Sequence, residues 1–463
     1  MIISEKKINI GLNLFFSGLI SIIYFCLKFA GYYDFDLRLM AVIGLIPVFS
    51  TVLIFLKMKD IRIAVITLVL YQTWNMFLEP YTWSKPIKSL YRVFNPDDFY
   101  LMALFSAISI WTLYLGFMYG MKSIKSDSIF SEKYMSSDNI GKLLIYMIVG
   151  GYILQLIQIV ISFLGLSLGF LGLIETMLPA TVGAVALLYW LRGGRKFIYL
   201  LLSFIYSTYY FIYFVGGTLF IYSIFLVVAP IIVYIVERRK IPYKVIILVA
   251  ILLMPIYMTR HVYRNEGLYS KGIVRMSLGM KILKREYSNI DFKRWKELYE
   301  TAKINENVDN RMEGVTYLGT IIHSIDIGKS QYAYGKTMIW FPTMILPRFF
   351  IPFRPSQNMG DQWAVYYGLK DPSWRASINF PMLCEFYANY GYLGMIIFSF
   401  FNGFLIVWFI RKFNDGRGDA NLLLLIFVVT KIIVIEANVT LAYGAILQVL
   451  AVCWLSKRVL LNK

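Results

Sequence analysis

Two arginines frame a short polar run, Arg260-His261-Val262-Tyr263-Arg264, where an apolar stretch ends and a polar stretch of roughly 120 residues begins. If a helix continues through this run, Arg260 and Arg264 lie four residues apart and share one helix face. Two neighbouring guanidinium groups repel each other unless an anion lies between them, and the guanidinium fork suits the paired oxygens of a phosphate. The spacing therefore predicts an anion site.

Further arginines and acids follow in the same polar stretch. Arg348 and Arg354 belong to or follow an apolar segment, 337–353, that three prolines interrupt before it could span a bilayer. Irregular backbone survives at membrane depth only where protein or water satisfies it, so we expect this segment to re-enter the membrane or lie at its edge, lining a cavity. Asp361 and Arg375 follow before the next apolar run. This clustering indicates a site rather than a linker.

The composition indicates a membrane protein. Hydrophobic residues make up 59% of the chain and charged residues 16%, and the mean hydropathy is +0.63, which leaves too few polar groups to cover a soluble globule. The apolar runs are mostly about 20 residues long, enough to cross a bilayer as helices, and they lack the alternation of barrel strands. The sequence predicts an all-α, polytopic integral membrane protein.

The order of the apolar runs predicts about twelve transmembrane helices. They lie near residues 8–31, 37–57, 62–79, 98–120, 141–163, 168–191, 197–214, 218–236, 244–259, 386–410, 420–438 and 440–457. Because alternate short loops are basic, the positive-inside rule places both termini in the cytoplasm. Three parts follow: helices in 1–259, a large late periplasmic loop with short helices in 260–385, and helices in 386–463.

The net charge of +19 is explained by this topology. Most of the basic excess lies in the inner loops, where it orients the helices and meets anionic membrane lipids, and no nucleic-acid-binding module is visible. The three cysteines are scattered and predict neither a disulfide framework nor a metal site. Within the large loop, residues from Met276 to about Arg311 read as one surface helix resting on lipid headgroups.

Two segments resemble a known family. Leu346–Pro355, together with Phe380–Gly394 at the start of a late helix, is similar to the Wzy-type polymerases that join oligosaccharide repeat units in the assembly of bacterial surface polysaccharides such as O-antigen. The pattern Glu385-x-Tyr387-x-Asn389-x-Gly391 carries most of the resemblance. The rest is shared architecture. An Arg-x10-Gly motif found in some members is absent from this chain.

The resemblance, which extends more distantly to the O-antigen ligases, implies a metal-independent glycosyltransferase of the bacterial inner membrane that needs no cofactor. It would transfer a growing glycan from undecaprenyl diphosphate to the next lipid-linked repeat unit, with a polysaccharide chain-length regulator as a further partner. Preorganised arginines stabilise the charge that grows on a departing diphosphate. We expect Arg260, Arg264 and Arg348 to bind it, with Arg354 and Arg375 as further candidates.

The incoming sugar hydroxyl must lose a proton, so a base is expected within hydrogen-bond reach. The candidates are Glu385, His261 and Asp361, followed by His323. An acid at a helix N-terminus is also an ordinary capping choice, and His261 could instead order the neighbouring arginines.

Three other functions stay open at this stage. An O-antigen ligase would use the same donor. A metal-dependent polyprenyl-phosphate glycosyltransferase would use acidic ligands such as Asp34 and Asp36, although hard cations need more oxygen ligands than these two supply. A flippase or exporter of the lipid-linked glycan would also hold phosphate but would need a polar path across the membrane.

Overall fold

The computed structural model of the 463-residue chain describes residues 35–58, 60–82, 96–124, 133–163, 169–217, 220–259, 263, 272–288, 291–297, 314–341, 343, 359–372, 380–413, 416–433 and 438–461. In these ranges the regular structure is helical and contains no β-strand, which confirms the all-α part of the predicted fold class. The first predicted membrane helix, 8–31, lies outside the described residues.

Every later apolar run forms a helix close to its predicted bounds. These helices are α2 (Phe35–Met58), α3 (Ile61–Phe77), α5 (Pro96–Ser123), α6 (Ser137–Phe163), α7 (Gly169–Leu191), α8 (Phe197–Gly216), α9 (Phe220–Arg238), α10 (Tyr243–Thr259), α17 (Met382–Lys412), α18 (Asp419–Ile432) and α19 (Val439–Leu461). Within the described residues, five helical segments are long and apolar enough to cross a membrane, in α2, α5, α6, α8 and α17. Shorter apolar helices accompany them.

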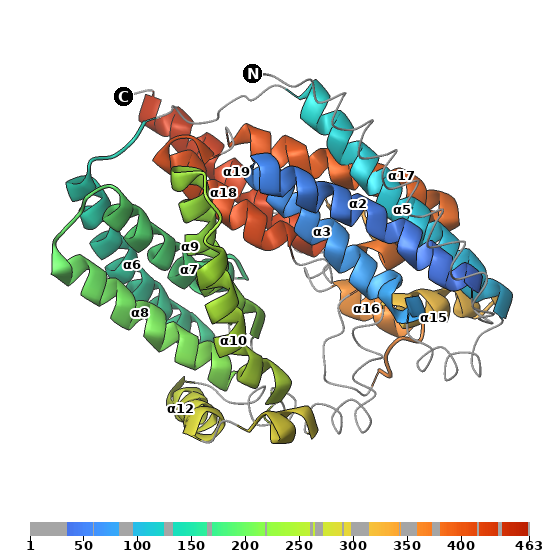
Figure 1. The fold of residues 1–463 in the computed structure, drawn as a ribbon, viewed down its shortest axis with the longest axis horizontal. Helices are drawn as coiled ribbons and strands as arrows, with labels where there is room; N and C mark the ends of the chain where they lie inside the picture. Colours follow the sequence, from blue (N-terminus) through green and yellow to red (C-terminus); the bar gives the residue numbers. More distant parts are fainter. Residues whose placement is uncertain are drawn as a thin grey trace.

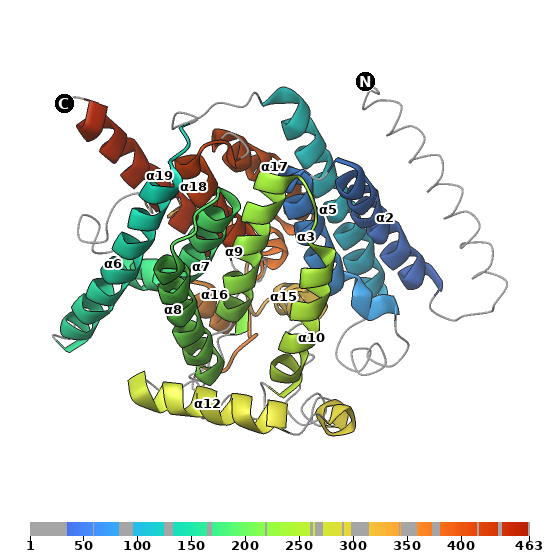
Figure 2. The same cartoon turned by 60° about the vertical axis from the view of Figure 1, so that its left-hand side comes forward.

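The helices form two groups (Figures 1 and 2). One group holds α2, α3, α5 and α17 side by side; the other holds α6, α7, α8 and α9, and α18 contacts both. The α5–α17 pair meets through glycines. A Cβ added at Gly116 would lie 1.9 Å from the Phe400 carbonyl oxygen, and one at Gly403 would lie 2.1 Å from that of Leu113. Small residues at such crossings let two membrane helices touch through their backbones.

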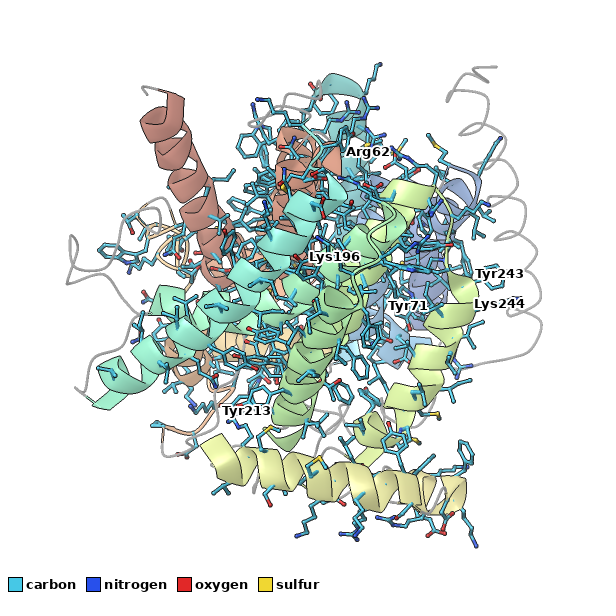
Figure 3. The ribbon with its side chains drawn as sticks, turned by 90° about the vertical axis from the view of Figure 1, so that its left-hand side faces the viewer. Arg62, Tyr71, Lys196, Tyr213, Tyr243 and Lys244 are labelled. Atoms are coloured by element: carbon cyan, nitrogen blue, oxygen red, sulfur yellow. The ribbon has the colours of Figure 1, made fainter. Side chains whose placement is uncertain are left out.

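An ion-pair network closes one end of the bundle. Arg192, directly after α7, pairs with Asp419 at 2.6 Å and with Glu237 at 2.7 Å, while the Met135 backbone N–H donates to Asp419 at 2.6 Å. Burial alone would lower the pKa of Arg192, but the two acids raise it. We call this end, where α3, α6, α8 and α18 begin, the Asp419 end. In Figure 3, Arg62 and Lys196 lie toward it, and Tyr213 lies beside α12 at the opposite end.

The described part of the long polar stretch after α10 contains short helices, as the sequence predicted. It contains α12 (Gly272–Ser288), α15 (Gly314–Asp326) and α16 (Met359–Tyr366). Buried residues of α15 include Val315, Leu318 and Ile321, and this helix packs against α3, α5 and α17. Part of the stretch read as an outer loop is therefore integrated into the bundle.

The single surface helix predicted from Met276 to about Arg311 is wrong in its extent. Helix α12 begins at Gly272 and ends at Ser288, and a second helical turn occupies residues 292–297. The cause is local, because the Asp291 carboxylate accepts the Arg294 backbone N–H at 3.0 Å, as an N-cap residue does. Residues beyond 297 in that prediction lie outside the described residues until Gly314.

Candidate functional site

Helix α17 is broken near its start, inside the sequence pattern that carries the family resemblance. Tyr390 (φ −144°, ψ 24°) and Gly391 (φ 63°, ψ −153°) leave helical geometry, so Met382–Asn389 forms a short first segment. The Gly391 conformation is essentially restricted to glycine. A Cβ there would also lie 3.3 Å from the Tyr332 hydroxyl. The break therefore explains why this position holds glycine.

Glu385 lies in the short first segment and is fully buried. One of its carboxylate oxygens, Oε2, accepts the backbone N–H of Val439, the first residue of α19, at 2.7 Å. The Thr337 hydroxyl faces the same carboxylate, but Oε1 has no hydrogen-bond partner of regular geometry among the described residues. Within those residues no arginine or lysine acts on this carboxylate. A buried carboxylate in this state is unusual and indicates a functional position.

Asn389, one helical turn after Glu385, binds the turn formed by residues 331–341. Its side-chain amide donates to the Thr337 hydroxyl at 2.7 Å and to the Glu385 carbonyl at 2.7 Å, and its oxygen accepts the Gly335 N–H at 2.8 Å. The Ala333 N–H donates to the Ala388 carbonyl at 2.7 Å, at the broken end of the short segment. The turn thus satisfies backbone groups that the break in α17 leaves without helical partners.

Tyr387 faces the same turn. Its buried ring lies 6.1 Å from that of Tyr332 and 5.0 Å from that of Tyr392, and the Tyr332 hydroxyl bonds to its own. Glu385, Tyr387 and Asn389 therefore each contact the 331–341 turn or the start of α19, and Gly391 forms the break in α17 beside Tyr332. We call this region, with α15 and α16, the Glu385 end.

Helix α16 brings Asp361 toward the Glu385 end. A Cβ at Gly360 would lie 3.2 Å from Phe380 and 3.4 Å from the Asn438 side chain, directly before Val439. At the other end of α16, the Tyr367 hydroxyl donates to the Gln331 carbonyl at 3.0 Å. Two sequence-predicted base candidates, Asp361 and Glu385, thus come from elements that meet at the start of α19.

A second polar group lies at α12. The Tyr263 hydroxyl donates to Oε1 of Glu286 at 2.8 Å, and the Trp295 indole N–H donates to Oε2 at 3.1 Å. Sequence reasoning identified the arginines on either side of Tyr263 but missed Tyr263 and Glu286. A tyrosine between two arginines and a lone acid within a basic helix were the signals that could have suggested them.

A small cavity lies beside α17. It has a volume of about 20 Å³, enough for one water molecule. Thr73, Ser399, Asn402 and Tyr443 supply polar atoms among its otherwise apolar lining, and the Tyr443 hydroxyl donates to the Asn402 amide oxygen. This cavity is distinct from the Glu385 carboxylate, which does not line it.

The structure describes few of the other candidate residues. Arg260, His261, Arg264, Arg348, Arg354 and Arg375 lie outside the described residues. His323 lies exposed in α15. The Pro-rich segment predicted to re-enter the membrane is described only as far as Thr343, and without Pro342. Its described part consists mainly of turns, and its Thr337 hydroxyl accepts a hydrogen bond from Asn389 of α17. No protein-family model, curated protein or solved structure matches the chain.

Proposed function

We propose that this protein is a polysaccharide polymerase of the bacterial inner membrane. It transfers a growing glycan from undecaprenyl diphosphate to the next lipid-linked repeat unit on the periplasmic face. About twelve spans place both termini in the cytoplasm, and the Glu385 end and α12 face the periplasm. A chain-length regulator is an expected partner, and no metal takes part.

The observation that carries the proposal is the arrangement of the motif around Glu385. Of the four residues that carry the resemblance to Wzy-type polymerases, Glu385, Tyr387 and Asn389 hold the late loop or the start of α19 against α17, and Gly391 permits the break in α17 beside Tyr332. If the motif served only to cap the N-terminus of a helix, Glu385 alone would be sufficient. Its joint use to hold a loop over a buried, unneutralised carboxylate supports a catalytic centre at this end.

Among the candidate bases, the structure describes the side chains of Glu385 and His323, and of these two Glu385 is buried and His323 is exposed. The Oε1 atom of Glu385 can take a proton from the attacking sugar hydroxyl, while the Val439 N–H holds the other oxygen in place. Asp361 and His261 remain candidate bases. Arg260, Arg264 and Arg348, with Arg354 and Arg375, are proposed to stabilise the departing diphosphate, because a preorganised guanidinium stabilises charge that develops in the transition state.

Purified protein supplied with a lipid-linked repeat unit tests the function. We expect a ladder of products of increasing length, and we expect chelation of divalent metals to leave it unchanged. Arg260→Ala and Arg348→Ala should each shorten or abolish the ladder. A single product on a different acceptor would indicate a ligase, and loss of activity with the chelator would indicate a metal-dependent transferase. No glycan transfer of any kind would refute the proposal.

A lipid-linked glycan flippase is the second candidate, and one observation favours it. Helix α17 is discontinuous, and many transporters use broken helices to bind cargo. Reconstituted liposomes separate the two functions. Elongation of repeat units supplied only on the outer leaflet supports the polymerase, whereas translocation without elongation supports the flippase.

A further inference from the structure

The side chain of Asn389 is buried, and its amide has one orientation that satisfies every neighbour. The amide nitrogen donates to the Thr337 hydroxyl and to the Glu385 carbonyl, each at 2.7 Å, and the amide oxygen accepts the Gly335 N–H at 2.8 Å. A reversed amide would place its oxygen against the Glu385 carbonyl and its nitrogen against the Gly335 N–H, and neither contact could be a hydrogen bond. The orientation of this amide is therefore fixed.

The Asn389 amide in turn fixes the direction of the Thr337 hydroxyl. A hydroxyl carries one proton, and the Thr337 oxygen already accepts from the amide. Its own proton is therefore directed to an acceptor, and the Glu385 carboxylate faces it. An ionised carboxylate only accepts, so Thr337 is the donor in this contact. The contact does not have regular geometry in this state, and hydrogen bonds to catalytic groups commonly tighten only when substrate is bound.

Thr337 is held from two sides. Its hydroxyl is bound by Asn389 of α17, and its backbone carbonyl accepts the Thr440 hydroxyl of α19 at 3.4 Å. The residue is 2% exposed, so water does not compete for these bonds. The hydroxyl cannot turn away from Glu385 without breaking its bond to the Asn389 amide.

The start of α19 supplies a second donor to the same carboxylate. The Val439 N–H donates to Oε2 of Glu385 at 2.7 Å. Asn438 fixes this helix start, because its side-chain oxygen accepts the Leu441 N–H at 2.7 Å, as an N-cap residue does. Two donors on separate elements, the 331–341 turn and α19, thus act on one carboxylate.

The second donor determines the angle of the carboxylate. A single bond, from Val439 to Oε2, leaves the group able to turn about the line of that bond. A donor from another direction removes this freedom. Orientation matters for a base, because its lone pair must point at the proton that it removes, and a catalytic group that is held loosely loses rate even when it is present.

We propose that Thr337 is a positioning residue for Glu385, and that its hydroxyl, oriented by Asn389, holds the carboxylate at the angle at which it removes the proton of the incoming sugar. The proposal rests on the function proposed above, in which Glu385 is a base. Thr337 itself takes no proton and touches no substrate. Because it acts through Glu385, it should affect the rate only while residue 385 is a carboxylate.

Three substitutions test this role in the polymerisation assay. Thr337→Val removes the hydroxyl and keeps the shape of the side chain, whereas Thr337→Ser keeps the hydroxyl. Thr320→Val in α15 is the matched control, because the Thr320 hydroxyl donates to the Thr316 carbonyl of its own helix at 2.8 Å. At equal amounts of folded protein, we expect Thr337→Val to lower kcat about tenfold, equal to about 1.4 kcal/mol.

The pattern among the variants separates positioning from stability. In Thr337→Val, KM for the donor should stay close to the wild-type value, because the hydroxyl does not bind substrate. Thr337→Ser should restore most of kcat, and Thr320→Val should leave kcat and KM unchanged. A residue that only stabilised the turn would change the amount of folded protein and leave kcat per folded molecule at the wild-type value.

A double variant tests whether Thr337 acts through Glu385. Glu385→Gln has no carboxylate base, so adding Thr337→Val should leave its residual rate unchanged. Damage to another part of the site would instead multiply the two losses.

Three results would overturn the positioning role. The first is a wild-type kcat per folded molecule in Thr337→Val. The second is a Thr337→Ser variant as slow as Thr337→Val. The third is a double variant that is slower than Glu385→Gln by the full factor seen for Thr337→Val alone. Failure of the polymerase proposal is seen separately, as the absence of a product ladder in wild type.

Discussion

Two buried carboxylates at opposite ends of the bundle are held in different ways. Asp419 is 1% exposed and is neutralised by Arg192, which also pairs with Glu237, and the Met135 backbone N–H donates to Oδ2 of Asp419. Glu385 is equally buried and accepts the backbone N–H of Val439 at the start of α19, but no described cation neutralises it. The Asp419 carboxylate is therefore neutralised by a described cation, whereas the Glu385 carboxylate is not.

The difference separates stability from function. A buried charge costs several kcal/mol unless it is paired, so an unpaired carboxylate persists only where the rest of the structure imposes it. Around Glu385 that structure is the broken start of α17 and the turn held by Asn389. We infer that the Asp419 end stabilises the packing of the helices. The Glu385 end keeps a reactive carboxylate without a cation, which lowers the stability of the folded protein.

The largest effect on stability is expected at the Asp419 end. Arg192→Met leaves Asp419 buried without its cation, and breaking such a pair by removing one partner costs about 3–5 kcal/mol. Thermal unfolding in detergent can be followed by labelling Cys384, which is fully buried, in a variant whose other two cysteines are serine. Adding Asp419→Asn should restore part of the loss. If the thermal unfolding midpoint of Arg192→Met equalled that of wild type, the Asp419 end would not have the stabilising role that distinguishes it from the Glu385 end.

A smaller loss of stability is expected from a substitution at the break in α17. Gly391→Ala forces a side chain into a conformation reserved for glycine, at a cost of about 1–3 kcal/mol. Gly150→Ala in α6 is the control, because a Cβ there meets nothing within 4 Å. The same Cys384 assay should show early labelling only in Gly391→Ala. If Gly150→Ala were the more damaging change, the break would not be a fixed feature.

The hydrogen bond between the 331–341 turn and α17 should contribute less to the stability of the folded protein. Thr337→Val keeps the side-chain shape but removes the hydroxyl that accepts from Asn389, a loss of about 1 kcal/mol. Thr181→Val removes a hydroxyl that bonds only within its own helix and serves as control. Hydrogen exchange of the 331–341 turn should rise in Thr337→Val alone, and a uniform rise in both variants would count against local docking.

The smallest effect is expected for an exposed pair. Lys196 and Asp138 lie 3.2 Å apart at the Asp419 end, and both side chains are more than half exposed. Solvent screens such pairs, so Asp138→Asn should give no measurable shift in the unfolding midpoint. A clear shift would mean that the Asp419 end depends on surface charge as well as on its buried network.

The membrane helices could be placed from the sequence because each is a long apolar run, and run length alone decides that a segment can cross a bilayer. Helix α15 was not placed from the sequence because it is too short to cross a bilayer. The spacing of Val315, Leu318 and Ile322 on one helical face was the available signal. Glu385 was identified through its motif, but its bond to Val439 joins residues 54 positions apart, which no local pattern encodes. Tyr263 and Glu286 were missed for the same reason.

The most direct test compares Glu385→Gln with Asp419→Asn in the polymerisation assay, at equal amounts of folded protein. Glutamine can still accept the Val439 N–H, so Cys384 should stay protected while the loss of the base lowers the rate of elongation by about 100-fold or more. Asp419→Asn should elongate the glycan at the wild-type rate per folded molecule, although it unfolds earlier. A full product ladder from Glu385→Gln would contradict the assignment of function to this end of the molecule.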